Sequence, residues 1–242
     1  MDDTNSSTAS GPVTVTVTDG IAVIDLDDGK ANALGFDVLS ALEGALDRAE
    51  EDDVTAVVLV GREGKFSAGF DLSVMTSGPE GARDMLGRGA ELGLRFYMFP
   101  KPVVFGVTGH ALAMGAILLC CADVRIGADG PFKIGLPEVA IGMPVPGFAV
   151  GICQDRLAIP AFTEAIQLAK VFAPADAEAA GFLDEVVDAA EVRDRAISTA
   201  AELAERLHAG PFRVTRRIVR GDVADRLKAQ LADDLSGFDV SA

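Results

Sequence analysis

Two short stretches of small residues hold the positions whose types and spacing could do chemistry. Residues 66–72 (FSAGFDL) follow the apolar run 56–60, and residues 109–117 (GHALAMGAI) follow the apolar run 103–107. Each apolar run is typical of a buried strand, and each stretch of small residues then opens into a helix. The first N–H groups of a helix have no intrahelical acceptor and lie at the positive end of its dipole. Two such turns that face each other would form an oxyanion hole for a thioester carbonyl.

The same stretches carry a family resemblance. The patterns S-A-G-x-D-L at 67–72 and G-H-A-x-x-x-G-A at 109–116 resemble the two signature segments of the crotonase (enoyl-CoA hydratase/isomerase) superfamily. The likeness runs from about Val13 to about Val187 and includes the segments KANAL, LPE and GMP, which begin at residues 30, 136 and 142. The resemblance implies an α/β fold with a crotonase-like β-β-α spiral core and a C-terminal helical region. It also implies a homotrimer or a dimer of trimers.

The resemblance further implies roles for individual residues. The backbone N–H groups of Phe70 and Met114 are expected to form the oxyanion hole, and Glu138 is expected to be the catalytic acid and base. Small neighbours would leave room for the thioester to approach these N–H groups. The expected substrate-binding residues are Lys30, Ala31, Ala33, Leu34, Ala68, Gly69, Asp71, Gly115 and Ile117. No cofactor is expected, because coenzyme A is part of the substrate.

One position departs from the family pattern and bears on the reaction. Superfamily members that hydrate enoyl-CoA well usually use two glutamates, and Ile117 occupies the second glutamate position. A single glutamate can still move a proton from C2 to C4 of a 3-enoyl-CoA, which isomerises the double bond. We therefore expect isomerisation, or weak hydration, with Glu138 as the base and its pKa raised by apolar surroundings. Glu91, on a predicted helix, could replace the missing carboxylate, but periodicity does not place it.

Other functions and structural roles remain open. A chain that keeps the oxyanion hole but lacks a carboxylate could be a non-catalytic acyl-CoA binding protein. A dehalogenase, decarboxylase or thioesterase would need a polar group near the acyl carbon, for which Asp71 and His110 are the candidates. Asp71 is equally suited to cap the following helix, and a lone histidine such as His110 is more often a hydrogen-bonded core residue. Glu138 could be a surface acid, and Asp123 could cap a helix or pair with Arg125.

Composition and charge describe a globular protein with a sizeable core. Of its 242 residues, 49% are hydrophobic and 24% are charged, which suits one large domain. The 21 basic and 37 acidic residues give a net charge of −16, which disfavours nucleic acid and anionic membranes as partners. A coenzyme A site in such a chain needs local positive charge, and the candidates near the signature segments are Lys30, Arg62, Lys65 and Lys101.

Cysteine, histidine and hydropathy patterns favour a cytoplasmic protein without a metal. Cys120 and Cys121 are adjacent in an apolar pattern and Cys153 stands apart, so a disulfide framework is not expected. The two histidines are not grouped with other ligand-forming residues at metal-binding spacing. No apolar run reaches the ~18–20 residues of a membrane span. Residues 1–12 lack the basic and apolar regions of a secretion signal.

Local patterns predict the elements that must position these residues. Valine and threonine alternate over 13–18, and an Asp-Gly turn leads to the apolar segment 21–26, which together predict a hairpin. The remaining predicted strands are 56–60, 103–107, 124–126 and 185–187. The predicted helices are 36–49, 79–99, 160–169, 175–180, 192–207 and 214–235, besides those that the two signature stretches open. Alternation of strands and helices favours an α/β core with a parallel sheet.

The alternation stops near Asp188, which predicts a boundary. We divide the chain into a disordered tail (1–12), a crotonase-like spiral core (13–188) and a C-terminal helical lid or oligomerisation region (189–242). One face of the first C-terminal helix could bind another subunit or pack on the chain's own core. This face consists of Ala196, Ala200, Leu203 and Leu207. The basic residues Arg213, Arg216, Arg217 and Arg220 could meet coenzyme A phosphates from a neighbouring subunit or only balance charge.

Overall fold

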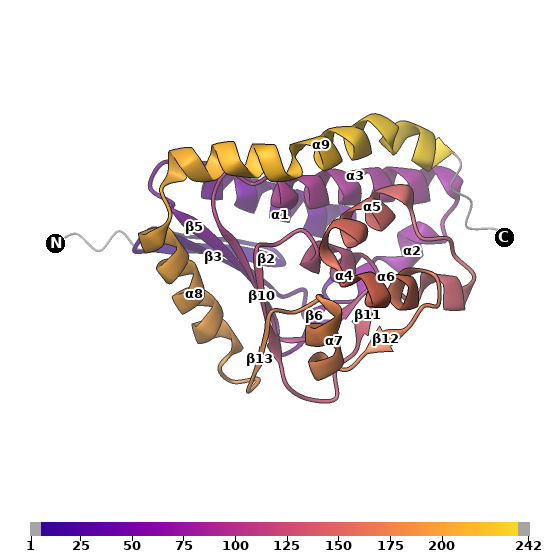
Figure 1. Ribbon diagram of the computed structural model, residues 1–242, viewed down its shortest axis with the longest axis horizontal. Coiled ribbons are helices and arrows are strands. Elements are labelled where there is room, and N and C mark those ends of the chain that lie inside the picture. Colours follow the sequence, from indigo (N-terminus) through magenta and orange to yellow (C-terminus); the bar gives the residue numbers. More distant parts are fainter. Residues whose placement is uncertain (1–5, 237–242) are drawn as a thin grey trace.

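The computed structural model describes residues 6–236, and its larger sheet has seven strands (Figure 1). Their order is β1-β2-β3-β5-β8-β10-β13. The bounds are β1 (Ser6–Ser10), β2 (Val13–Thr18), β3 (Ile21–Leu26), β5 (Ala56–Gly61), β8 (Val103–Val107), β10 (Val124–Ala128) and β13 (Glu185–Val187). The first three strands pair antiparallel, and the strands from β3 to β13 pair in parallel. The sheet confirms the predicted hairpin and the predicted parallel core.

The hairpin shows why local sequence predicts it well. The valines of β2 are buried and its threonines are more exposed, as expected for a strand with one face on the core. Asp19 and Gly20 both have positive φ, of 51° and 78°, which suits the tight turn between β2 and β3. The prediction of a disordered tail was wrong for residues 6–10, which form β1 and pair with β2. Residues 1–5 of that predicted tail lie outside the described residues.

Helices cover both faces of the parallel strands, so the central strands β5 and β8 are apolar throughout. On one face, α8 (Val192–Arg206) buries Ala196 and Ala200 against Ile21, Val23 and Val58. The opposite face packs against α1 (Phe36–Glu50) and α3 (Pro79–Tyr97) within the main core cluster. The small-residue face of α8 therefore packs on the chain's own sheet. The region after residue 188 thus begins with a layer of the core and not with a detached lid.

A smaller sheet lies at the ends of two of these strands. It consists of β6 (Gly64–Ser67), β9 (Gly109–Leu112), β11 (Ile134–Gly135) and β12 (Val171–Phe172), in the order β12-β11-β9-β6. The strands β6, β9 and β11 run in parallel. A separate parallel pair joins β4 (Ala33–Leu34) to β7 (Gly69–Phe70). Local patterns did not predict these strands, because strands of two to four residues are too short to show a period.

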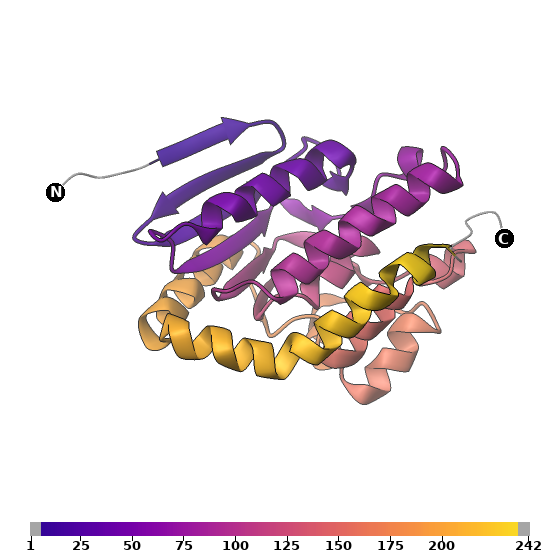
Figure 2. The ribbon, with the colours of Figure 1, turned by 90° about the horizontal axis from the view of Figure 1, so that it is seen from above.

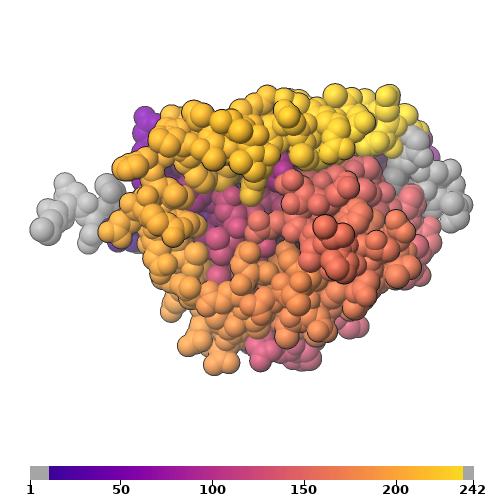
Figure 3. All heavy atoms as spheres, viewed as in Figure 1, coloured from indigo at the N-terminus to yellow at the C-terminus, as the bar shows by residue number. Residues whose placement is uncertain are grey.

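The remaining helices surround the smaller sheet and close the molecule. They are α2 (Leu72–Met75), α4 (Met114–Leu119), the 3-10 turn η1 (Glu138–Ile141), α5 (Gly147–Arg156), α6 (Ile159–Ile166), α7 (Pro174–Ala180) and α9 (Ala209–Ser236). Figure 2 shows α9 beside α3, which in turn lies beside α1. In the space-filling view, α9 covers the upper edge of the molecule (Figure 3). None of the helices in the described part is both long and apolar enough to cross a membrane.

Buried ion pairs hold α9 on the rest of the chain. Asp123 accepts a hydrogen bond from Arg216 of α9 and forms an ion pair with Arg220 of the same helix at 3.1 Å. Its carboxylate also accepts a hydrogen bond from the N–H of Val103 at 2.9 Å. The predicted partner of Asp123 was wrong, because Arg125 instead binds Asp184 at 3.0 Å. Arg216 and Arg220 are therefore occupied within the chain itself. A third basic residue of this helix, Arg217, is paired with Asp225 of the same helix.

Candidate active site

Three neighbouring parallel strands lead into the three segments that the sequence analysis singled out. Ala111 of β9 is the register partner of both Ser67 in β6 and Ile134 in β11. The three strands continue into the two signature stretches and the Leu-Pro-Glu segment. The carboxyl ends of parallel strands meet at one edge of the sheet, which is where α/β proteins commonly bind ligands. The smaller sheet therefore brings the predicted catalytic residues to one place.

The N–H of Phe70 points away from the strand that pairs with it. The next N–H along the chain, that of Asp71, donates to the carbonyl of Leu34 in β4 at 3.3 Å. Successive N–H groups of an extended strand point to opposite sides. The N–H of Phe70 is therefore expected on the side away from β4.

The second predicted donor begins a helix. Met114 is the first residue of α4, so its N–H has no acceptor within the helix. Ala113 precedes it with φ 52° and ψ −126°, a conformation that residues with a side chain rarely adopt. The N–H of Ala113 donates to the carbonyl of Gly135 at 3.0 Å, so β11 helps to hold this turn. Strained backbone of this kind is concentrated at functional sites.

The two signature segments touch backbone to backbone. A Cβ added at Gly69 would lie 3.1 Å from the N atom of Met114, so this N–H is adjacent to the first segment. A Cβ added at Gly115 would lie 2.5 Å from the carbonyl oxygen of Ser67. Any side chain at either glycine would push the segments apart. Gly69 and Gly115 therefore allow the backbones of the two signature segments to approach each other closely.

Glu138 is a buried carboxyl group without a neutralising partner. Its residue is 7% exposed, and its Oε2 has no hydrogen-bond partner within the described part of the chain. Burial raises the pKa of the Glu138 carboxyl from its ordinary value of 4.5 to about 7. A carboxyl group with such a pKa can both accept and donate a proton near neutrality. The interpretation of Glu138 as an exposed surface acid was wrong.

Glu138, Phe70 and Met114 line one apolar cavity of about 160 Å³. Ile117, an aliphatic side chain, lines it as well. Of the predicted substrate-binding residues, Ala68 and Ile117 are in the wall. The lining residues that local sequence did not single out include Leu72, Met75, Leu86, Ile141 and Phe148. Leu86 comes from α3, whose apolar spacing was its only signal in the sequence, and Phe148 comes from α5, which the local patterns did not predict.

The predicted loop 30–34 lies along the first signature segment. The carbonyl of Ala31 accepts a hydrogen bond from the N–H of Ala68 at 3.0 Å, while Ala33 and Leu34 form β4. Asn32, which local sequence did not single out, is fully buried and holds the loop. Its amide donates to the carbonyls of Leu26 and Phe66, at 2.8 and 3.1 Å. The loop is thus fixed beside the cavity.

The other candidate polar residues have structural roles. Asp71 caps α2 by accepting a hydrogen bond from the N–H of Ser73 at 2.8 Å, as predicted. His110 accepts a hydrogen bond through Nδ1 from the N–H of Lys133 at 3.0 Å and does not line the cavity. Lys101, a candidate for binding coenzyme A, donates to the carbonyls of Ala49 and Glu51 at 2.9 and 2.6 Å. Lys101 is therefore engaged at the end of α1.

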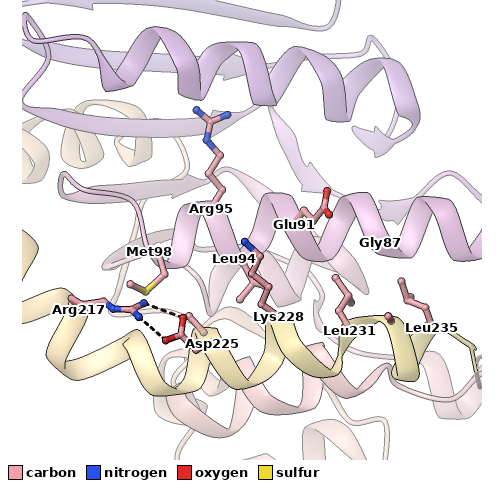
Figure 4. A pocket seen from close by; sticks show the side chains of 12 residues that line it. Gly87, Glu91, Leu94, Arg95, Met98, Arg217, Asp225, Lys228, Leu231 and Leu235 are labelled. Atoms are coloured by element: carbon pink, nitrogen blue, oxygen red, sulfur yellow. Dashed lines mark hydrogen bonds and ion pairs between the residues drawn. The ribbon is translucent and has the colours of Figure 1, made fainter.

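Glu91 lies in a different and larger depression. A groove of about 750 Å³ runs between α3 and α9, with Leu94, Leu231 and Leu235 on its floor (Figure 4). Glu91 lines this groove and is exposed, so it does not replace the missing carboxylate of the cavity. The groove is open to solvent and contains neither of the two predicted backbone donors. The smaller cavity, and not this groove, has the features of a catalytic site.

Comparisons with known proteins agree with this architecture. The chain has the crotonase fold, since solved structures of that class cover nearly all of it. The family model for enoyl-CoA hydratase/isomerase matches residues 16–240. The chain therefore belongs to the enoyl-CoA hydratase/isomerase family, as the signature segments predicted.

Individual relatives carry names from within this family. The apo structure of an enoyl-CoA isomerase from Mycobacterium tuberculosis is 43% identical, with a TM-score of 0.90 over 95% of this chain and 100% of its own. Mouse mitochondrial enoyl-CoA delta isomerase 1 is 31% identical over 224 residues, which are 90% of this chain and 77% of the mouse protein. A glyoxysomal fatty acid beta-oxidation multifunctional protein from Brassica napus is 34% identical over 216 residues. Those residues are 83% of this chain and only 28% of the plant protein.

Proposed function

We propose that this protein isomerises the double bond of 3-enoyl-CoA thioesters to the 2-enoyl position, with Glu138 as its single acid and base. The observation that carries the proposal is a partnerless buried carboxyl group in an apolar cavity that Ile117 also lines. The family name covers hydration and isomerisation, so membership alone does not choose between them. The name of the mouse relative favours isomerisation, whereas the M. tuberculosis protein is named an isomerase in one solved structure and a probable hydratase in another.

The reaction needs one proton shuttle and one place for negative charge. Glu138 as a carboxylate takes a proton from C2 of the substrate, and the electrons move onto the thioester oxygen as a dienolate. The N–H groups of Phe70 and Met114 would bind this oxygen, and each such donor contributes roughly 3–4 kcal/mol to transition-state stabilisation. The carboxyl group of Glu138 then returns the proton at C4. The double bond ends between C2 and C3, with no net gain or loss of atoms.

The raised pKa of Glu138 suits this exchange. The substrate must first lose a proton to the carboxylate and then regain it from the carboxyl group, so the ideal pKa lies near the working pH. Burial places the pKa of Glu138 at about 7. Because the free enzyme must carry the ionised form, we expect kcat/KM to rise with a single ionisation near that pH.

Hydration would require more polar groups in the cavity than isomerisation does. Adding water across a double bond requires a positioned water, a base for its proton and an acid for C2. Ile117 can neither hold a water by hydrogen bonding nor exchange a proton. We therefore expect hydration of a 2-enoyl-CoA to be much slower than isomerisation.

Coenzyme A binding is proposed at the loop 30–34. Lys30 is exposed on this loop, and its carbonyl accepts a hydrogen bond from Arg62 at 2.6 Å, while Arg62 also forms an ion pair with Asp27 at 3.0 Å. The charge of Lys30 would attract the phosphates of coenzyme A. Ala68, whose N–H is tied to this loop, lies at the entrance side of the cavity and is exposed. The assembly of the protein as a homotrimer or a dimer of trimers stays a prediction.

The direct test is turnover of 3-hexenoyl-CoA by the purified protein. We expect formation of the conjugated 2-enoyl thioester, followed by its absorbance, and a loss of roughly 10²–10⁴-fold in kcat for Glu138→Gln. Glu91→Gln is the matched control, because Glu91 is an exposed glutamate in the α3/α9 groove. It should keep the wild-type rate. Full activity of Glu138→Gln would reject the role of Glu138.

The same protein tests the alternative of a binding protein without catalysis. Isothermal titration with a saturated acyl-CoA measures binding independently of turnover. Tight binding without product from any 3-enoyl-CoA would favour the binding protein. Conversion of 2-enoyl-CoA to the 3-hydroxy product faster than isomerisation would favour a hydratase.

A further inference from the structure

The side chain of Phe70 occupies a space that α3 leaves open at one residue. A Cβ added at Gly89 would lie 2.2 Å from Cζ and 2.4 Å from Cε1 of the Phe70 ring. These distances mean that the tip of the ring rests directly on the backbone of α3, in a notch that only glycine provides. Gly93, one turn further along α3, faces α4 with ordinary contacts of 3.5 Å to Cys121 Sγ and 3.6 Å to Met114 Cε.

The ring in this notch is also part of the wall of the acyl cavity. Phe70 lines the cavity together with Leu86 of α3 and Met75 of α2, so the ring lies between the cavity and the backbone of α3. The cavity of about 160 Å³ is smaller than the ~300–1,000 Å³ of pockets that enclose drug-sized ligands.

We propose that the Phe70 ring, seated against Gly89, limits the substrate to short acyl chains. This inference rests on the proposed function, because it takes the cavity to be where the acyl chain of the thioester binds. Phe70 then has two separate roles. Its backbone N–H serves the oxyanion, and its side chain sets the length of the acyl chain that fits.

Removal of the ring should lengthen the preferred substrate. In Phe70→Ala the backbone donor remains, and the space of the phenyl group joins the cavity. A pocket separates substrates that differ by one methylene by roughly 10–200-fold. We expect the ratio of kcat/KM for 3-decenoyl-CoA to that for 3-hexenoyl-CoA to rise at least tenfold over wild type. Phe70→Leu, which keeps an apolar side chain, should shift the ratio less in the same direction.

A change in α3 should have the opposite effect through the same ring. In Gly89→Ala the new methyl group would overlap the ring, which must move toward the cavity. We expect the activity to fall most for the longest chains, so the ratio decreases. Gly93→Ala is the matched control, since it makes the same change on the same helix with contacts of 3.5 Å or more. Its chain-length profile should equal that of wild type.

The double variant separates a direct effect from a general loosening of α3. If Gly89→Ala acts by moving the ring, it should have little further effect on the profile in the Phe70→Ala background, so the two changes are non-additive. Additive shifts would contradict the proposal. So would an unchanged profile in both Phe70→Ala and Phe70→Leu when circular dichroism and thermal unfolding show folded protein.

Binding measurements keep this inference distinct from the proposed function. Dissociation constants for butyryl-, hexanoyl-, octanoyl- and decanoyl-CoA report chain length without chemistry. If no variant turns over substrate but Phe70→Ala binds the longer chains at least tenfold tighter than wild type does, the isomerase proposal fails and the ring still sets the length. If isomerisation occurs with the same length profile in Phe70→Ala as in wild type, the inference fails and the isomerase proposal stands.

Discussion

Burial is the main influence on the charge of the Glu138 carboxyl group. The cavity around it is apolar, and its Oε2 has no hydrogen-bond partner among the described residues. A buried carboxyl group in such surroundings favours its neutral form. The burial that would suit Glu138 to act as an acid and base therefore also means that its ionisation lowers the stability of the folded state.

The pH dependence of stability measures this cost. The pKa of Glu138 is about 7 in the folded protein and near 4.5 when the group is solvated, so the folded state binds more protons between these values. Stability from this group therefore falls as the pH rises through that window. We expect the free energy of unfolding of Glu138→Gln, relative to wild type, to increase by about 3 kcal/mol between pH ~4.5 and pH ~8. Denaturant unfolding at several pH values measures it. A difference that does not change with pH would show that Glu138 is solvated.

At the scale of elements, the smaller sheet decides whether the two donors meet. Its strands β6, β9 and β11 place their carboxyl ends side by side, and the segments that follow make backbone contact. Gly115 is the point of closest approach, because its Cα faces the carbonyl of Ser67. The proposed oxyanion hole would thus depend on the distance between two elements as well as on the identity of any one residue.

A methyl group at this contact should separate the elements. In Gly115→Ala the added Cβ would lie 2.5 Å from the carbonyl oxygen of Ser67, so one of the segments must shift. We expect kcat to fall roughly 10²–10³-fold, as when one oxyanion donor is lost. Gly44→Ala on α1 is the control, because a Cβ there meets nothing within 4 Å. It should keep kcat and gain up to ~1 kcal/mol in stability. Equal kcat in the two variants would contradict the placement of the hole.

At the scale of the whole molecule, α9 supports two of the helices that line the cavity, α3 and α5. It packs along α3, which carries Leu86, and along α5, which carries Phe148. A Cβ at Gly151 of α5 would lie 2.5 Å from Leu227 of α9, so these helices are in close contact. The anchor of α9 is the ion-paired group of Asp123, Arg216 and Arg220. The C-terminal helix α9 therefore supports the side of the cavity that α3 and α5 form.

Loss of this anchor should destabilise the protein. Asp123→Asn leaves the buried Arg216 without its counter-ion, and burial already lowers the pKa of that guanidinium. Removing one partner of a buried pair costs about 3–5 kcal/mol, so we expect a loss of that size in the free energy of unfolding. Arg217→Gln is the control, because the Arg217–Asp225 pair is exposed, and its stability should match wild type. Similar stabilities of the two variants would show that the buried group does not hold α9.

Local sequence by itself determined the parts of this protein that depend on neighbours along the chain. The valine and threonine alternation of β2, the Asp-Gly turn and the apolar spacing of α1 and α3 each record which face is buried, so these elements were predicted nearly to their ends. The signature segments identified the family and led to Glu138 and the two donors. The capping role of Asp71 also follows from adjacent residues, since its partner is two positions away.

Only the tertiary structure decided which distant groups meet. The strands β6, β9 and β11 are too short to have a recognisable period, and their pairing comes from the sheet as a whole. Asp123 pairs with α9 and not with Arg125, and Glu91 faces the groove and not the cavity. The burial that raises the pKa of Glu138, and the notch at Gly89 that receives the Phe70 ring, arise where segments far apart in sequence pack together. The hydrophobic periodicity of a segment indicates that one of its faces is buried. Which other segment covers that face is determined by the packing of the whole chain.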